Sequence, residues 1–139
     1  MSDIITITGI VATDPRHIVT QAGLDVSNFR VASAQGHYDS DVGKWVETGT
    51  NWYSVSAFRQ LAVGVTSSLR RGERVIVTGK LRVSAWEDGD KSGTNVEIDA
   101  DAIGHDLTWG TTVYTRTPRA GDAAAQVTPA DPTTGTGPF

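Results

Sequence analysis

The chain has 139 residues, a formal net charge of −4 and no cysteine. This length allows one ordinary domain with a substantial core, and the lack of cysteine excludes disulfides, thiolate metal sites and cysteine nucleophiles. The acidic balance argues against nucleic-acid binding by bulk charge but leaves room for a local basic stripe. No apolar run approaches the length of a membrane span, and the N-terminal residues do not resemble a secretory signal, so we expect a cytoplasmic protein.

The first half of the chain predicts strands. Residues 3–12 alternate apolar and polar side chains, and Asp14-Pro15 closes this strand. A short strand is expected at 17–19 and a second long strand at 25–34. Residues 35–50 combine glycines with polar residues, which predicts a long hairpin loop or two strand tips joined by a mobile connection.

The middle of the chain predicts a third strand at 51–58 followed by a short helix at 60–69. Leu61, Val65 and Leu69 recur at a spacing of four, which puts them on one helical face. Two arginines and a glycine follow and are typical of a helix end.

The remaining elements are a fourth strand at 73–86, a turn at 87–93, a fifth strand at 94–103 and an extra C-terminal strand at 108–115. Beyond them, residues 116–139 are rich in Ala, Thr, Pro and Gly and have no apolar period, so we expect a disordered tail. Five strands with one helix between the third and fourth is the order of a five-stranded Greek-key barrel, the OB-fold. The sequence therefore predicts an all-β domain over residues 1–115.

The third predicted strand alternates in an unusual way. Trp52 and Phe58 share one face with Ser54 and Ser56, because successive side chains of a strand point to opposite sides. A core strand would rarely place serines between its rings, whereas a surface on which flat ligands stack fits this pattern.

Rings and cations share a face on the neighbouring strands too. Lys80, Arg82 and Trp86 point away from the apolar row of the fourth strand. Arg30 lies on the outer face of the second strand and shares it with Tyr38 if that strand continues beyond residue 34. Bases stack on aromatic rings with little regard to sequence, and cations neutralise phosphates. This pattern indicates binding of single-stranded nucleic acid rather than of a duplex, whose bases are not exposed.

Two alternatives stay open at this point. An OB-fold adaptor that binds protein partners through the same aromatic face fits the pattern, and Trp45 and Trp109 fit loop anchors or subunit contacts. An enzyme is disfavoured, because the histidines lack metal-ligand spacing, the row of Glu97, Asp99 and Asp101 fits a solvated edge, and no catalytic motif occurs. We expect no cofactor, no metal and no catalytic residue.

Four segments together resemble the bacterial single-stranded DNA-binding proteins. They are TGIVATDP at 8–15, VSNFRVAS at 26–33, TNWYSVSAFRQLA at 50–62 and LRRGERVIVTGKLRVSAWED at 69–88. The resemblance covers about residues 3–107 and includes features of actinobacterial members.

The resemblance implies sequence-tolerant binding of single-stranded DNA in replication, recombination or repair by a homotetramer associated with the nucleoid. It assigns base stacking to Tyr38, Trp52, Phe58 and Trp86. With the outer cations it suggests phosphate contacts by Arg30, Arg59, Lys80 and Arg82. By analogy, residues 108–115 would clamp neighbouring subunits.

The chain departs from the family pattern in three places. The first strand has Gly9-Ile10 where Gly-Asn is common, and Ile18 and Val19 stand where an Arg and an aromatic are usual. The tail keeps the terminal Pro138-Phe139, which we expect to bind partner proteins weakly, but lacks the acidic cluster before it. These departures suggest an accessory paralogue or a mobile-element version.

Overall fold

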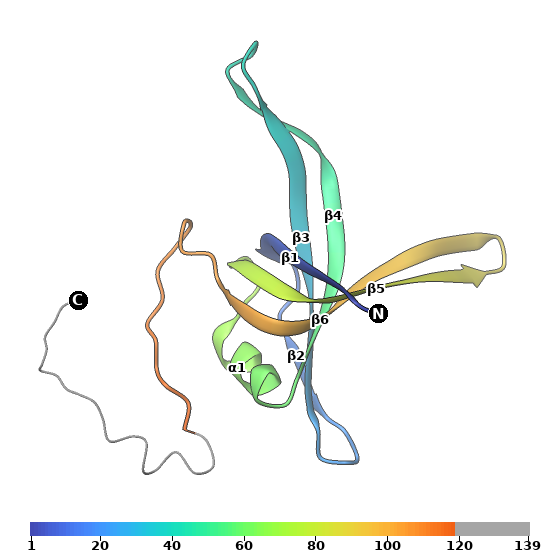
Figure 1. Ribbon diagram of the computed structural model, residues 1–139, viewed down its shortest axis with the longest axis vertical. Helices are drawn as coiled ribbons and strands as arrows, with labels where there is room; N and C mark the ends of the chain where they lie inside the picture. The colour runs from blue at the N-terminus through green and yellow to red at the C-terminus, as the bar shows by residue number, and fades with distance from the viewer. Residues whose placement is uncertain (119–139) are drawn as a thin grey trace, which may run out of the picture.

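Strands and one short helix build the domain shown in Figure 1, a computed structural model that describes residues 1–118. The elements in chain order are β1 (Asp3–Val11), β2 (Arg16–Val19), β3 (Asp25–Asp39), β4 (Lys44–Phe58), α1 (Gln60–Ser68), β5 (Arg74–Asp88) and β6 (Lys91–His105). The expected strand order and the helix between the third and fourth long strands are confirmed.

The strands form one sheet that closes on itself. Its order is β1-β5-β6-β4-β3-β2, and β1 also pairs with β3 through Ile10 and Val11. All pairings are antiparallel except β4 with β6. Closure needs glycine at position 9, because a Cβ there would lie 2.6 Å from the Ala32 carbonyl oxygen. The all-β OB barrel predicted from the sequence is confirmed.

The inward-facing side chains of the strands and one face of α1 fill the barrel interior. The buried apolar residues are Val11, Phe29, Val31, Val55, Ala57, Ala62, Val65, Leu69, Val75, Val77 and Ile98. Fully burying one such branched side chain contributes about 1.5–3 kcal/mol. The helix is also tied to β3, because the Thr66 hydroxyl donates a hydrogen bond to the buried Ser27 hydroxyl at 3.2 Å.

Two long hairpins, β3–β4 and β5–β6, project beyond the barrel (Figure 1). Of the two alternatives expected for residues 35–50, the structure shows the strand tips, because β3 and β4 continue to a turn at 40–43. Likewise β5 and β6 pair up to a turn at 89–90. The tips of these strands lack the alternation of apolar and polar residues that predicts a strand, because a hairpin outside the barrel has no face in the core. Gly43 and Gly89, with φ of 71° and 62°, form the tight turns.

The expected extra strand at 108–115 is wrong for the single chain, whose residues from 107 to 118 form no strand. Residues 107–118 form a C-terminal arm, in which Val113 and Tyr114 are 94% and 85% exposed. A cleft of about 560 Å³ separates this arm from α1. Within the described chain, residues 107–118 pair with no strand of the sheet. No helix over the described residues is long and apolar enough to cross a membrane. The tail expectation, with Pro138 and Phe139, falls almost wholly outside the described residues, and the domain boundary stays a prediction.

Candidate nucleic-acid interface

The outer side of β4 carries the alternation seen in the sequence. Trp52 is 50% exposed, whereas the side chains of Val55 and Ala57 are buried. Ser54 and Phe58 are partly exposed on the same side as Trp52. The predicted outward face of this strand is therefore confirmed, although Phe58 offers less open surface than Trp52.

Trp52 lies beside a cation from β3. The Arg30 guanidinium sits 5.4 Å from the centre of the Trp52 ring, within the range of a cation–π contact. The pairing of Ala32 with Trp52 and of Arg30 with Ser54 fixes this neighbourhood. One side chain that can stack on a base is thus held next to one that can neutralise a phosphate.

A shallow hollow of about 380 Å³ continues this face. Arg16, Arg30, Ser54 and Glu97 are among the residues that line it. Arg16 of β2 thus lies in the same hollow as Arg30 of β3. The hollow also brings a carboxylate to the edge of the basic surface.

The β5–β6 side of the face is charge-balanced. Arg82 donates to both carboxylate oxygens of Asp99, at 3.0 and 3.1 Å, and to Glu97 at 3.0 Å. The bond to Asp99, then the charges of Asp99 and Glu97, raise the pKa of the Arg82 guanidinium. Lys80 is exposed, and no ion pair within the described residues includes it. Glu97 and Asp99, expected on a solvated edge, instead bind the guanidinium of Arg82, which the sequence predicted to contact phosphate.

Trp86 and Tyr38 are carried on the two hairpins, away from the barrel. Trp86 is 42% exposed and its ring lies over Gly93, where an added Cβ would meet the ring at 2.6 Å. Tyr38 is 64% exposed near the tip of β3. The structure thus places Tyr38, Trp52 and Trp86 on solvent-facing surfaces of three different strands.

Arg59 joins β4 to α1 in an unusual backbone conformation. It is the residue before the helix, with φ of 60° and ψ of −131°, and its side chain makes no capping hydrogen bond. Its N–H instead donates to the Asp25 carbonyl at 2.8 Å. The sequence suggested a phosphate contact by Arg59 but gave no sign of its strained backbone conformation.

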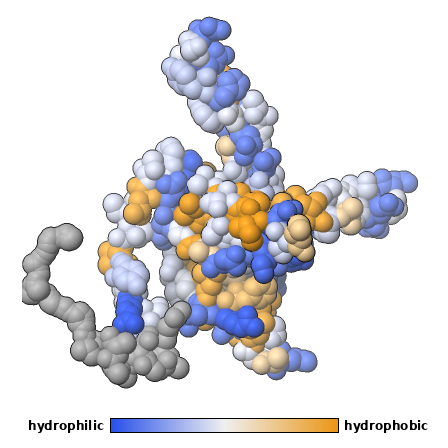
Figure 2. Space-filling model, in the orientation of Figure 1, coloured by the Kyte–Doolittle hydropathy of each residue, from blue (hydrophilic) through white to orange (hydrophobic). Residues whose placement is uncertain are grey.

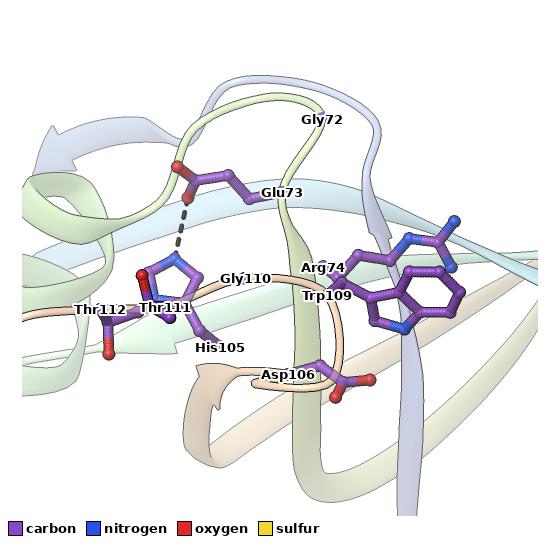
Figure 3. A pocket seen from close by; sticks show the side chains of 9 residues that line it. All are labelled: Gly72, Glu73, Arg74, His105, Asp106, Trp109, Gly110, Thr111 and Thr112. Atoms are coloured by element: carbon purple, nitrogen blue, oxygen red, sulfur yellow. Dashed lines mark hydrogen bonds and ion pairs between the residues drawn. The ribbon is translucent and has the colours of Figure 1, made fainter.

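A second hollow, of about 300 Å³, lies where the arm leaves β6 (Figure 3). There the His105 ring and the Glu73 carboxylate form a hydrogen bond of 2.9 Å, which lowers the pKa of Glu73. The Arg74 guanidinium lies 4.2 Å from the centre of the Trp109 ring. Trp109 therefore anchors the arm to the barrel, as the sequence allowed. No cluster of three or more metal-ligating side chains occurs within residues 1–118.

Comparison with known proteins identifies the family. The model of the single-strand binding protein family matches residues 3–106. The chain belongs to this family. Its members are binding proteins, and the resemblance read from the sequence motifs is confirmed.

The similar proteins include second copies from actinobacteria. Single-stranded DNA-binding protein 2 of Tropheryma whipplei is 41% identical over 112 residues, which cover 81% of this chain and 74% of that protein. The crystal structure of the small single-stranded DNA-binding protein from Streptomyces coelicolor has a TM-score of 0.71 at 37% identity and covers 78% of this chain and 98% of that one. The second such protein, SSBb, of Mycobacterium smegmatis has a TM-score of 0.63 at 24% identity, covers 84% and 100% of the two chains, and supports the fold alone.

Proposed function

We propose that this chain binds single-stranded DNA with little regard to sequence and protects it during replication, recombination or repair. The observation that carries the proposal is the half-exposed Trp52 ring with the Arg30 guanidinium 5.4 Å from its centre. Family membership and the names of the relatives agree with it. No catalytic step or cofactor is needed.

Base stacking supplies much of the affinity in this proposal. Tyr38, Trp52, Phe58 and Trp86 act as platforms, and each base stacked on a ring is worth roughly 1–3 kcal/mol. The serines between the rings of β4 leave room for bases to lie flat. Because every base has a flat aromatic face, this mode tolerates any sequence.

Phosphate contacts come from Arg30, Arg59 and Lys80. Arg82 contributes less than the sequence suggested, because Asp99 and Glu97 already occupy its donors. For single strands, the slope of log affinity against log salt is about −0.7 per phosphate neutralised. With few unoccupied cations, the salt dependence should be modest.

We propose that the working form is a homotetramer. In the described chain β1 pairs with β5 along its length but with β3 only at Ile10 and Val11, so one edge of β1 is open. The outward side chains of Ile4 and Ile76 are 59% and 42% exposed, and Figure 2 shows hydrophobic residues gathered over this part of the barrel. An open strand edge beside an apolar surface suits pairing with a second copy.

The cellular setting follows from the same proposal. The protein would act on nucleoid DNA in the cytoplasm, as an accessory paralogue or a mobile-element version. The terminal Pro138-Phe139, outside the described residues, would contact replication or repair proteins weakly, because no acidic cluster precedes it to steer association.

Titration of intrinsic tryptophan fluorescence with oligo-dT tests the proposal. We expect quenching at two salt concentrations by the single strand and none by an equal amount of duplex DNA. An adaptor that uses the aromatic face for protein partners would not be quenched by either, and that result would refute the proposed function.

A further inference from the structure

A single extra residue decides which way Trp45 faces. In a regular strand Trp45 would share the parity of Tyr53 and Val55, and Val55 is buried in the barrel. In the β3–β4 ladder, however, Gln35 pairs with Gly49 and Gly36 pairs with Glu47. Residue 48 has no partner in this register, so the parity of β4 reverses beyond it.

The bulge brings Trp45 to the same face as Trp52. Their partners on β3 are Tyr38 and Ala32, which are six residues apart and share one parity on that strand. At about 3.3 Å per residue, the two tryptophans are carried roughly 20 Å apart along the hairpin. Re-aiming a side chain is a recurrent use of a β-bulge.

Trp45 is also held in a defined orientation. An added Cβ at Gly36 would lie 2.8 Å from Cε2 and Nε1 of its indole, so the ring rests on the backbone of β3. The side chain is still 57% exposed, which leaves surface open to a ligand. Trp86 has the same arrangement over Gly93 on the other hairpin, and Trp86 is a proposed stacking residue.

Tyr38 lies across the strand pair from Trp45 and extends the aromatic surface. A Cβ at Gly43 would be 3.9 Å from the Tyr38 hydroxyl, so this ring is directed toward the hairpin turn, whereas Trp45 leans back over Gly36. The two rings therefore cover successive parts of one face. A hairpin without a core has no packing need for two large exposed rings.

We propose that Trp45 is a further base-stacking residue, which extends the path of single-stranded DNA from Trp52 on the barrel to the tip of the β3–β4 hairpin. The inference rests on the proposed function and adds a platform to it. The charged residue beside Trp45 on this face is Glu47, while Lys44 and its partner Asp39 have the opposite parity. The contact is therefore one of stacking and not of charge.

The test compares binding of a 35-nucleotide oligo-dT by the full chain and by five variants at two salt concentrations. Trp45→Ala should weaken binding by roughly 5- to 150-fold, the equivalent of one lost stacked base. Its salt slope should equal that of the unmodified protein, because no cation is removed. Trp45→Tyr should recover most of the affinity, and Val42→Ala, which truncates another exposed side chain of the hairpin, should bind normally.

Insertion of one alanine between Gln35 and Gly36 tests the bulge itself, because it gives residue 48 a partner in the β3–β4 ladder. The uninterrupted ladder turns Trp45 and Tyr38 to the face opposite Trp52, so affinity should fall at least as far as in Trp45→Ala. Thermal unfolding confirms that each variant keeps the barrel, since the hairpin lies outside the core.

The outcomes separate this inference from the proposed function. If Trp45→Ala binds as tightly as the unmodified protein while Trp52→Ala is weakened, the indole merely covers the hairpin backbone and the inference is overturned. If Val42→Ala loses as much affinity as Trp45→Ala, stacking on Trp45 is likewise refuted. If the unmodified protein does not bind oligo-dT, the proposed function fails and this inference fails with it.

Discussion

The two long hairpins that leave the barrel have strands of the same length and different chemistry. Each is built from two strands of 15 residues. The β3–β4 hairpin carries Tyr38, Trp45 and Trp52 on one face, with Arg30 beside the last ring. The β5–β6 hairpin carries Trp86, and near its base the Arg82 guanidinium is bonded to two carboxylates.

This difference separates the contribution of base stacking from the contribution of phosphate binding by cations. A ring keeps its stacking surface whatever its neighbours, whereas a cation that already has carboxylate partners must exchange them for a phosphate. We therefore expect the β3–β4 hairpin to set the strength of binding and the β5–β6 hairpin to set its response to salt and to charge substitutions.

The largest expected effect comes from removing Trp52. Trp52→Ala deletes a base platform and leaves Arg30 without its ring, so binding of oligo-dT should weaken by about 1–3 kcal/mol. Trp86→Ala should cost less, because its hairpin offers one ring. Equilibrium titrations measure both, with chemical denaturation as a control for folding. A greater loss in Trp86→Ala would reverse the comparison of the hairpins.

Neutralising the partners of Arg82 should strengthen binding. Asp99→Asn with Glu97→Gln leaves the guanidinium available to phosphate, so affinity should rise several-fold and the salt slope should steepen by about 0.7. Asp101→Asn is the matched control, because Asp101 is exposed on the same strand and has no bond to Arg82. Equal gains in the control and in the double variant would show a general charge effect.

The two cations of β5 should differ in importance. Lys80→Ala should weaken binding a few-fold and reduce the salt slope by about 0.7, since Lys80 is exposed. Arg82→Ala should change both quantities less, because its charge is offset by Glu97 and Asp99. Titration at four salt concentrations gives the slopes. A larger change in Arg82→Ala would mean that DNA displaces the carboxylates.

The smallest effect concerns the root of the β5–β6 hairpin, where Glu73 meets His105. The hydrogen bond lowers the pKa of Glu73, so the folded state binds this proton less tightly than the unfolded chain does. Its stabilising contribution is present above about pH 4.3, the usual glutamate value, and is lost as the pH falls through the lower folded pKa. Unfolding midpoints measured from pH 7 to pH 3 should therefore fall less in Glu73→Gln than in the unmodified protein.

The sequence predicted which side chains face outward where a strand is regular. It missed the orientations and contacts that depend on the register between two strands. The parity of Trp52 against Val55 was readable because that part of β4 is an uninterrupted strand. The orientation of Trp45 was not, because an unpaired residue in the hairpin reverses a period of two. The register of β5 and β6, which pairs Arg82 with Glu97, likewise includes a shift between Thr78 and Gly79.

The C-terminal arm shows a different limit. Of the apolar residues at 108–115 that predicted a strand, Trp109 packs on Arg74, whereas Val113 and Tyr114 are almost fully exposed. A strand, however, needs a partner strand for its hydrogen bonds, and residues 107–118 pair with none in the described part of the chain. The alternation of apolar residues in the sequence does not show whether the same chain or a second copy supplies the partner strand.

The backbone of Arg59 implies a trade-off between stability and activity. A positive φ of 60° in a residue other than glycine costs on the order of 1–3 kcal/mol, whereas glycine adopts it freely. Arg59→Gly should therefore produce a barrel that is harder to denature and that holds DNA less tightly. Under the proposed function, the chain keeps at this junction an arginine that contacts DNA in place of the glycine that would suit its own fold.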